Sequence, residues 1–240
     1  WNSWAVLRND IKLIVCGSAT SWMINNLIRN HGGLHNRLTH HLIVKPFTLH
    51  ECEEYFKAYH FGYSRKQIAE CYMVMGGIPY YLSMMDKSKS LAQNIDQLFF
   101  ADNAELKDEF NDLYRALFKK SADHIAVVTA LATKGMGMTR QELVKASGGK
   151  DNGAFSTVLE ELEQCGFIRL YEPFSTANKM TSDIRQKRNT LFQLVDFYTL
   201  FYFRFIRHNK YQDSCFWSSS QNSQLYHTWA GLSFEMLCLN

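Results

Sequence analysis

The sequence has little proline and no long apolar run. Only three prolines and 13 glycines occur among 240 residues, which excludes a collagen-like or proline-rich chain and favours helices. No run of about 18 apolar residues exists, so no transmembrane helix is predicted. The first residues carry no basic region followed by an apolar run, so no signal peptide is predicted. Hydrophobic residues make up 46% of the chain, which is enough for a packed core and rules out wholesale disorder.

Several chemical signatures are also absent. The six cysteines form no C-x-x-C pair, so their spacing predicts neither disulfides nor a zinc site, and scattered thiols favour a reducing, cytoplasmic location. No G-x-x-x-x-G-K-[ST] phosphate loop and no G-x-G-x-x-G fingerprint occurs, so the chain has no motif that holds a triphosphate by itself. His31 and His35 are separated by a Gly-Gly break, and no metal site is expected. Neither Cys16 nor Ser18 has a triad arrangement nearby, which argues against a hydrolase.

The charge of the chain is small but unevenly distributed. The 26 basic and 23 acidic residues give a formal net charge of +3, which does not by itself predict nucleic-acid binding. Residues 173–210 hold seven basic and two acidic residues, so this segment carries +5 and the remainder −2. Four of the basic residues lie in one polar stretch of this segment: Lys179, Arg185, Lys187 and Arg188. Such a loop is usually a solvated surface, and the alternative is contact with DNA phosphates.

The distribution of apolar residues predicts a mixed α/β, mostly α-helical fold. Residues 1–47 contain two short β-branched runs, at 11–16 and 42–44, and are expected to form the C-terminal part of an α/β domain. Residues 48–120 are expected to be almost entirely helical, with Thr48 as the first cap. The later helices of this part are expected at 91–99 and 105–118.

Residues 121–196 predict a winged helix-turn-helix, because three short helices precede two strands. The expected helices and strands lie at 122–133, 140–146, 154–165, 167–171 and 190–195. The third helix carries Glu160, Glu161 and Glu163, which is a poor face for phosphates. Residues 197–240 are expected to form an aromatic helix and the start of a further helical segment.

Three places suggest a ligand site. Ser18 follows the first strand, where a hydroxyl either points into the ligand crevice of an α/β sheet or caps the next helix. Arg37 precedes the second strand and suits either a phosphate contact or a surface ion pair. The sequence Gly77-Ile78-Pro79 breaks a helix, either as a simple corner or as a rigid proline that packs against a flat base.

These motifs follow one another in a definite order along the chain. In sequence they are Gly17-Ser18-Ala19-Thr20-Ser21-Trp22-Met23, then Arg37, then Lys45-Pro46-Phe47-Thr48-Leu49-His50-Glu51, then Gly76-Gly77-Ile78-Pro79-Tyr80-Tyr81-Leu82. This order resembles the archaeal-type P-loop ATPase family, one of the AAA+-like, STAND-type NTPases. The later segments 194–205 and 229–235 resemble the region that joins such ATPases to a C-terminal restriction-endonuclease-like domain of unknown function.

The resemblance implies roles for individual residues. Ser18 resembles the sensor residue on the strand that follows the Walker B strand. Arg37 matches an arginine that senses the γ-phosphate, either within the subunit or across the interface of a homo-oligomer. Gly77 and Pro79 resemble the lid motif whose proline lies near the adenine. Glu235 aligns with the first acidic residue of the nuclease-like fold, which implies that residues 197–240 form the aromatic helix and the start of a nuclease-like domain.

The resemblance also implies missing parts. The phosphate loop and the Walker B strand should lie before Trp1, and the remaining nuclease-like positions beyond Asn240. We therefore expect ATP and magnesium to bind the parent protein, and neither ATP hydrolysis nor a bound cofactor in this chain. The main prediction is part of an ATP-dependent switch that binds DNA through its winged helix. The alternatives are a non-enzymatic winged-helix DNA-binding regulator and a protein-interaction module.

Overall fold

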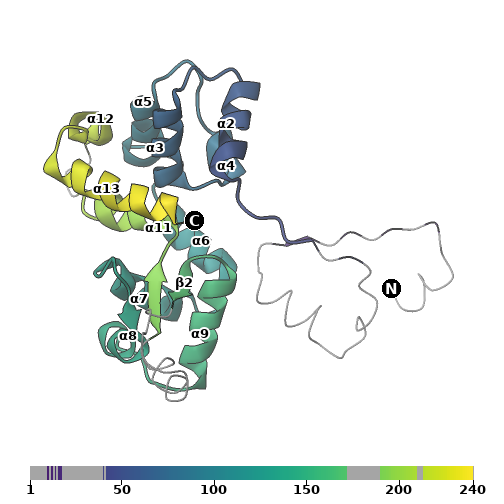
Figure 1. Ribbon diagram of the computed structural model, residues 1–240, viewed down its shortest axis with the longest axis vertical. Coiled ribbons are helices and arrows are strands. Elements are labelled where there is room, and N and C mark those ends of the chain that lie inside the picture. Colours follow the sequence, from purple (N-terminus) through teal and green to yellow (C-terminus); the bar gives the residue numbers. More distant parts are fainter. Residues whose placement is uncertain are drawn as a thin grey trace, which may run out of the picture.

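The computed structural model describes residues 10, 12, 14, 16–17, 40, 42–171, 190–209 and 213–239 (Figure 1). Within these residues the chain is mostly helical with one small antiparallel sheet, as predicted. Figure 1 shows two lobes: a helical lobe (residues 48–100 and 197–238) and a sheet lobe (residues 121–171 and 190–194). No helix in the described ranges is both long and apolar enough to cross a membrane.

The first half of the helical lobe is built from short, well-capped helices. The hydroxyls of Thr48, Ser64 and Ser90 each accept a hydrogen bond from the backbone three residues on, and the Glu or Gln at that position completes a capping box. The predicted cap at Thr48 is thereby confirmed. The elements are α2 (Leu49–Ala58), α3 (Arg65–Met75), α4 (Pro79–Ser83), α5 (Leu91–Ile95) and the π-helix η2 (Asp96–Phe100).

The second half of the helical lobe comes from the end of the chain. It comprises α11 (Phe197–Phe201), the π-helix η3 (Tyr202–Ile206), α12 (Phe216–Ser220) and α13 (Gln224–Cys238). These elements pack against α3, α5 and η2. The rings of Phe201, Phe205, Trp217 and Trp229 lie 5.0–5.8 Å apart, mostly edge to face, which is the favoured geometry for aromatic pairs. The aromatic residues therefore form the core that joins the two halves.

A buried carboxylate also joins the two halves. Asp96 of η2 is 6% exposed and accepts hydrogen bonds from the backbone nitrogens of Trp217 (2.7 Å) and Ser218 (3.1 Å). The hydroxyl of Ser218 donates to the same carboxylate. Because the first N–H groups of a helix have no partner within it, Asp96 supplies the cap for α12.

The sheet lobe surrounds three short strands. Its elements are α7 (Ser121–Ala132), β1 (Met138–Thr139), α8 (Arg140–Ser147), α9 (Gly153–Gln164), β2 (Ile168–Tyr171) and β3 (Leu191–Leu194). The sheet is antiparallel in the order β1-β3-β2, with Met138 opposite Phe192 and Ile168 opposite Leu194. Strand β1 is an addition to the two strands that the sequence predicts.

Helix α6 (Glu109–Leu117) lies between the lobes (Figure 1). Tyr114 of α6 is fully buried, and its hydroxyl lies 3.4 Å from the hydroxyl of Thr199 in α11. The ring of Tyr114 also lies 4.8 Å from the ring of Phe167, next to β2. The lobes also contact each other where Nε2 of Gln193 in β3 lies 3.5 Å from the sulfur of Met236 in α13.

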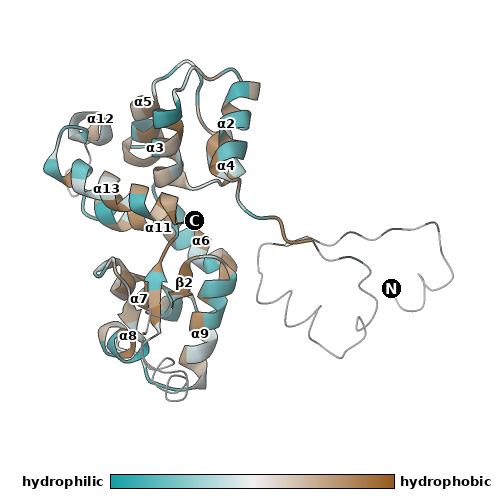
Figure 2. Ribbon diagram, viewed as in Figure 1, coloured by the Kyte–Doolittle hydropathy of each residue, from teal (hydrophilic) through white to brown (hydrophobic). Residues whose placement is uncertain are grey.

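The structure corrects three predicted elements. Residues 42–44 form no strand, and their side chains are 64–84% exposed; Figure 2 shows an apolar stretch outside both lobes. A strand needs a partner backbone, and the described residues offer none. The expected helix at 91–99 changes to a π-helix at Asp96, and the helix expected to begin at Glu105 begins at Glu109. Of the run at 11–16, the structure describes only residues 12, 14 and 16, and none of the three lies in a strand.

Candidate functional site

The turn between α3 and α4 contains Gly77 and Pro79, two of the predicted site residues. Gly76 ends α3 with φ at +64°, a conformation that favours glycine, and its N–H donates to the carbonyl of Tyr72. Pro79 is the first residue of α4, where the missing N–H of proline costs no helical hydrogen bond. Gly77 is buried, whereas Pro79 and Tyr80 are exposed. The turn therefore presents a rigid proline and an aromatic ring at the surface of the helical lobe.

The buried side chain of Tyr81 holds the turn against α6. It is 3% exposed, and its hydroxyl donates a 2.7 Å hydrogen bond to Oε1 of Glu109, the first residue of α6. Its ring lies 5.6 Å from that of Tyr198 in α11. Burial is the main cause that raises the pKa of Tyr81, and the adjacent Glu109 adds to it. The phenol is therefore neutral and positions α4 against α6.

A second, partly buried carboxyl lies at the start of α11. Asp196 caps this helix by accepting a 2.8 Å hydrogen bond from the backbone of Thr199. Burial raises the pKa of Asp196, and the hydrogen bonds from Thr199 partly oppose this. Burial also raises the pKa of the nearby Tyr114 well above its usual value, with the charge of Asp196 as the next cause. Tyr114 is fully buried and Asp196 is partly buried, and both contribute to the junction between the lobes.

The exposed face of α9 has no basic residue. Thr157, Glu160 and Gln164 lie on this face. Arg140 of α8 points its guanidinium to Asp151 at 2.7 Å, so its charge is already paired. The exposed face of α9 itself therefore offers no basic side chain to a phosphate, and the nearby exposed basic residues are Lys145 of α8 and Lys150 before α9.

A buried histidine of α7, His124, contacts the inner side of α9. His124 is 2% exposed, and its Nε2 lies 2.8 Å from Oε2 of Glu161. Its Nδ1 lies 3.0 Å from the carbonyl oxygen of Lys120, and its ring stacks on Phe118 at 3.9 Å. One of the three glutamates of α9 is therefore used inside the fold.

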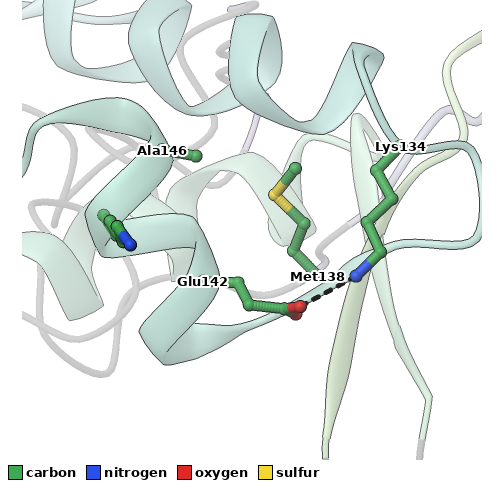
Figure 3. A pocket seen from close by; sticks show the side chains of 5 residues that line it. Lys134, Met138, Glu142 and Ala146 are labelled. Atoms are coloured by element: carbon green, nitrogen blue, oxygen red, sulfur yellow. Dashed lines mark hydrogen bonds and ion pairs between the residues drawn. The ribbon is translucent and has the colours of Figure 1, made fainter.

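Two shallow depressions lie on the sheet lobe, away from the turn at Pro79. The first, of about 350 Å³, is lined by Lys134, Met138, Glu142, Lys145 and Ala146 (Figure 3). A 2.8 Å ion pair between Lys134 and Glu142 spans it, and hydrogen bonds from Lys134 and Thr139 lower the pKa of Glu142 to about 2. The second, of about 300 Å³, lies between α7 and the start of α9. No group of three or more potential metal ligands occurs among the described residues.

The predicted site residues are only partly within the described chain. Gly77 and Pro79 lie together in one turn, and Glu235 is exposed on α13. Six others lie outside the described residues: Ser18, Arg37, Lys179, Arg185, Lys187 and Arg188. Sequence reasoning missed Tyr81 and Glu109, and the signal for Tyr81 was an aromatic residue two positions after the helix-starting proline.

Comparison with models of known protein families, with curated proteins and with solved structures finds no match. Functional inference therefore rests on the residues and their geometry.

Proposed function

We propose that this chain supplies the lid and the winged helix of an ATP-dependent switch of the AAA+-like, STAND type. The observation that carries the proposal is the turn at Pro79, whose exposed proline and Tyr80 are held by the partly buried hydrogen bond between Tyr81 and Glu109. A rigid apolar surface of this kind suits one face of a planar base. The motif order described above supports the same assignment.

The sheet lobe supports the winged-helix part of the proposal. Helices α7, α8 and α9 precede a sheet in the order β1-β3-β2, and the segment between β2 and β3 corresponds to the wing. Residues 121–196 would then be the winged helix and residues 48–120 the lid.

Helix α6 gives the two parts a physical connection. Its first residue accepts the hydrogen bond from Tyr81, and its Tyr114 contacts Phe167 at the start of the β2–β3 hairpin. A displacement of α4 on nucleotide binding would act on the sheet lobe through this helix. ATP and magnesium would be held largely by a phosphate loop that this chain does not contain, so the chain alone would not hydrolyse ATP.

The test measures binding of a fluorescent ATP analogue with magnesium to this chain and to a chain extended by the coding sequence before Trp1. We expect no binding by the chain alone and magnesium-dependent binding by the extended chain. Pro79→Ala in the extended chain should weaken binding about tenfold, whereas Gly62→Ala, at an open position, should not. An extended chain without a phosphate loop, or one that is insensitive to Pro79→Ala, would contradict the proposal.

A second candidate, a protein-interaction module, is favoured by the acidic face of α9. A gel shift with duplex DNA at low salt distinguishes a protein-interaction module from a DNA-binding domain. Binding that disappears in the triple variant Arg185→Ala, Lys187→Ala, Arg188→Ala would identify the wing as a DNA contact. Absence of any shift at low salt would favour a protein partner for α9.

A further inference from the structure

Residues 42–47 reach the helical lobe at Phe47, which contacts the turn before α4. The backbone N–H of Phe47 donates a 2.6 Å hydrogen bond to the carbonyl oxygen of Gly77. The side chains of Leu42, Ile43 and Val44 are 64–84% exposed and so contribute little to holding the segment. The segment is therefore attached at its C-terminal end, through Phe47.

The contact requires glycine at position 77. A Cβ atom placed on Gly77 would lie 1.8 Å from the carbonyl oxygen of Phe47 and 2.8 Å from its nitrogen. Neither atom belongs to a flexible side chain, so relief requires the backbone of the segment to move. Gly77 is thus needed for close approach of two backbones.

Tyr72 holds the other side of the same peptide. Its hydroxyl donates a 3.0 Å hydrogen bond to the carbonyl oxygen of Phe47. Its ring lies 5.5 Å from the ring of Phe197, at the start of α11. Phe47 also packs on Tyr55 of α2, with ring centroids 6.1 Å apart. Phe47 therefore contacts α2 and α3 directly and is linked to α11 through the ring of Tyr72.

We propose that Gly77 and Tyr72 form a latch that holds Phe47 on the turn before α4 and fixes the direction in which the chain joins the helical lobe. The latch links segment 42–47 mechanically to Pro79, two residues after Gly77, and to α11 through Tyr72. It requires no nucleotide, so it stands or falls separately from the proposed function.

The test is hydrogen exchange of the Phe47 amide, measured by NMR on the whole chain without ligand. In Gly77→Ala we expect this amide to exchange at least about tenfold faster, while the amides of Ile68 and Cys71 in α3 keep their rates. Tyr72→Phe keeps the ring against Phe197 and removes only the hydroxyl, so it should accelerate exchange at Phe47 by a few-fold with α3 unchanged. Gly62→Ala is the matched control, because a methyl group there meets nothing within 4 Å.

Two results would overturn the latch. One is a Phe47 amide that is unprotected in the wild-type chain, and the other is unchanged exchange at Phe47 in both variants. If Gly77→Ala accelerates the α3 amides as well, Tyr72→Phe decides: selective acceleration at Phe47 supports the latch, and its absence refutes it.

Discussion

Asp96 gives the sharpest prediction about what holds the helical lobe together. In Asp96→Ala, the backbone nitrogens of Trp217 and Ser218 and the hydroxyl of Ser218 lose their common acceptor. Hydrogen bonds to a charged group contribute about 1.5–3 kcal/mol each, but three bonds to one carboxylate are not additive. Helix α12 has only five residues, so its start can open toward water and recover part of the loss. We therefore expect the free energy of unfolding to fall by about 3 kcal/mol.

The assay is urea unfolding followed by tryptophan fluorescence, since Trp217 lies next to the cap. Asp102→Ala is the matched control, because Asp102 is an exposed aspartate two residues after η2 and should change stability by less than about 0.5 kcal/mol. Asp96→Asn should recover only part of the loss, because the amide presents one acceptor oxygen where the carboxylate presents two. A stability of Asp96→Ala within 0.5 kcal/mol of the wild type, measured at unchanged m-value, would refute the role of this carboxylate.

Three further changes test other parts of the fold. Burial raises the pKa of Glu70 in the folded protein, so the free energy of unfolding falls as pH rises through that pKa. Glu70→Gln cannot ionise and should not show this fall, so its melting temperature should exceed that of the wild type by more at higher pH. Gly137→Ala should lower stability by about 2 kcal/mol in thermal unfolding, because φ is +89° and a Cβ would lie 2.7 Å from a carbonyl of β3. His124→Ala should cost about 2–3 kcal/mol in urea unfolding, because Glu161 and the Lys120 carbonyl lose their partner and a cavity forms.

The first two changes have a control variant, and all three have a contradicting outcome. Glu163→Gln alters an exposed carboxyl, and parallel pH profiles for Glu70→Gln and the wild type would contradict the burial argument. Gly135→Ala meets nothing within 4 Å, so equal effects at positions 135 and 137 would exclude close approach as the cause. For His124→Ala, unchanged exchange rates of the α7 and α9 amides would show that the pair with Glu161 does not join these helices.

The sequence predicted local structure well where short-range signals decide it. The cap at Thr48, the break at Gly76–Pro79 and the three helices before the β2–β3 hairpin follow from hydroxyl, glycine and apolar spacing. It did not predict contacts between distant residues, such as Asp96 with Trp217 or Tyr81 with Glu109, because no local pattern specifies them. The π-helices were missed because each has only five residues, which is too short a stretch to define a period in the sequence.

The candidate site was predictable only in part. Gly77 and Pro79 were found because glycine and proline interrupt a helix, and this signal can be read from the sequence alone. The reason for glycine at 77 is the nearby backbone of Phe47, 30 positions earlier, and this appears only in three dimensions.

The return of α11–α13 to the helical lobe sets an order for folding during synthesis. The chain leaves this lobe after η2, builds the sheet lobe, and comes back about 100 residues later; Asp96 and Trp217 are 121 positions apart. The sheet lobe depends mainly on contacts between neighbouring segments and can fold once residue 194 has left the ribosome. Residues 48–100 lack their aromatic partners until α13 has been made, so an emerging chain exposes α3 and η2 to chaperones. A stop codon after Asp196 would remove α11–α13 and with them the second half of the core of the helical lobe.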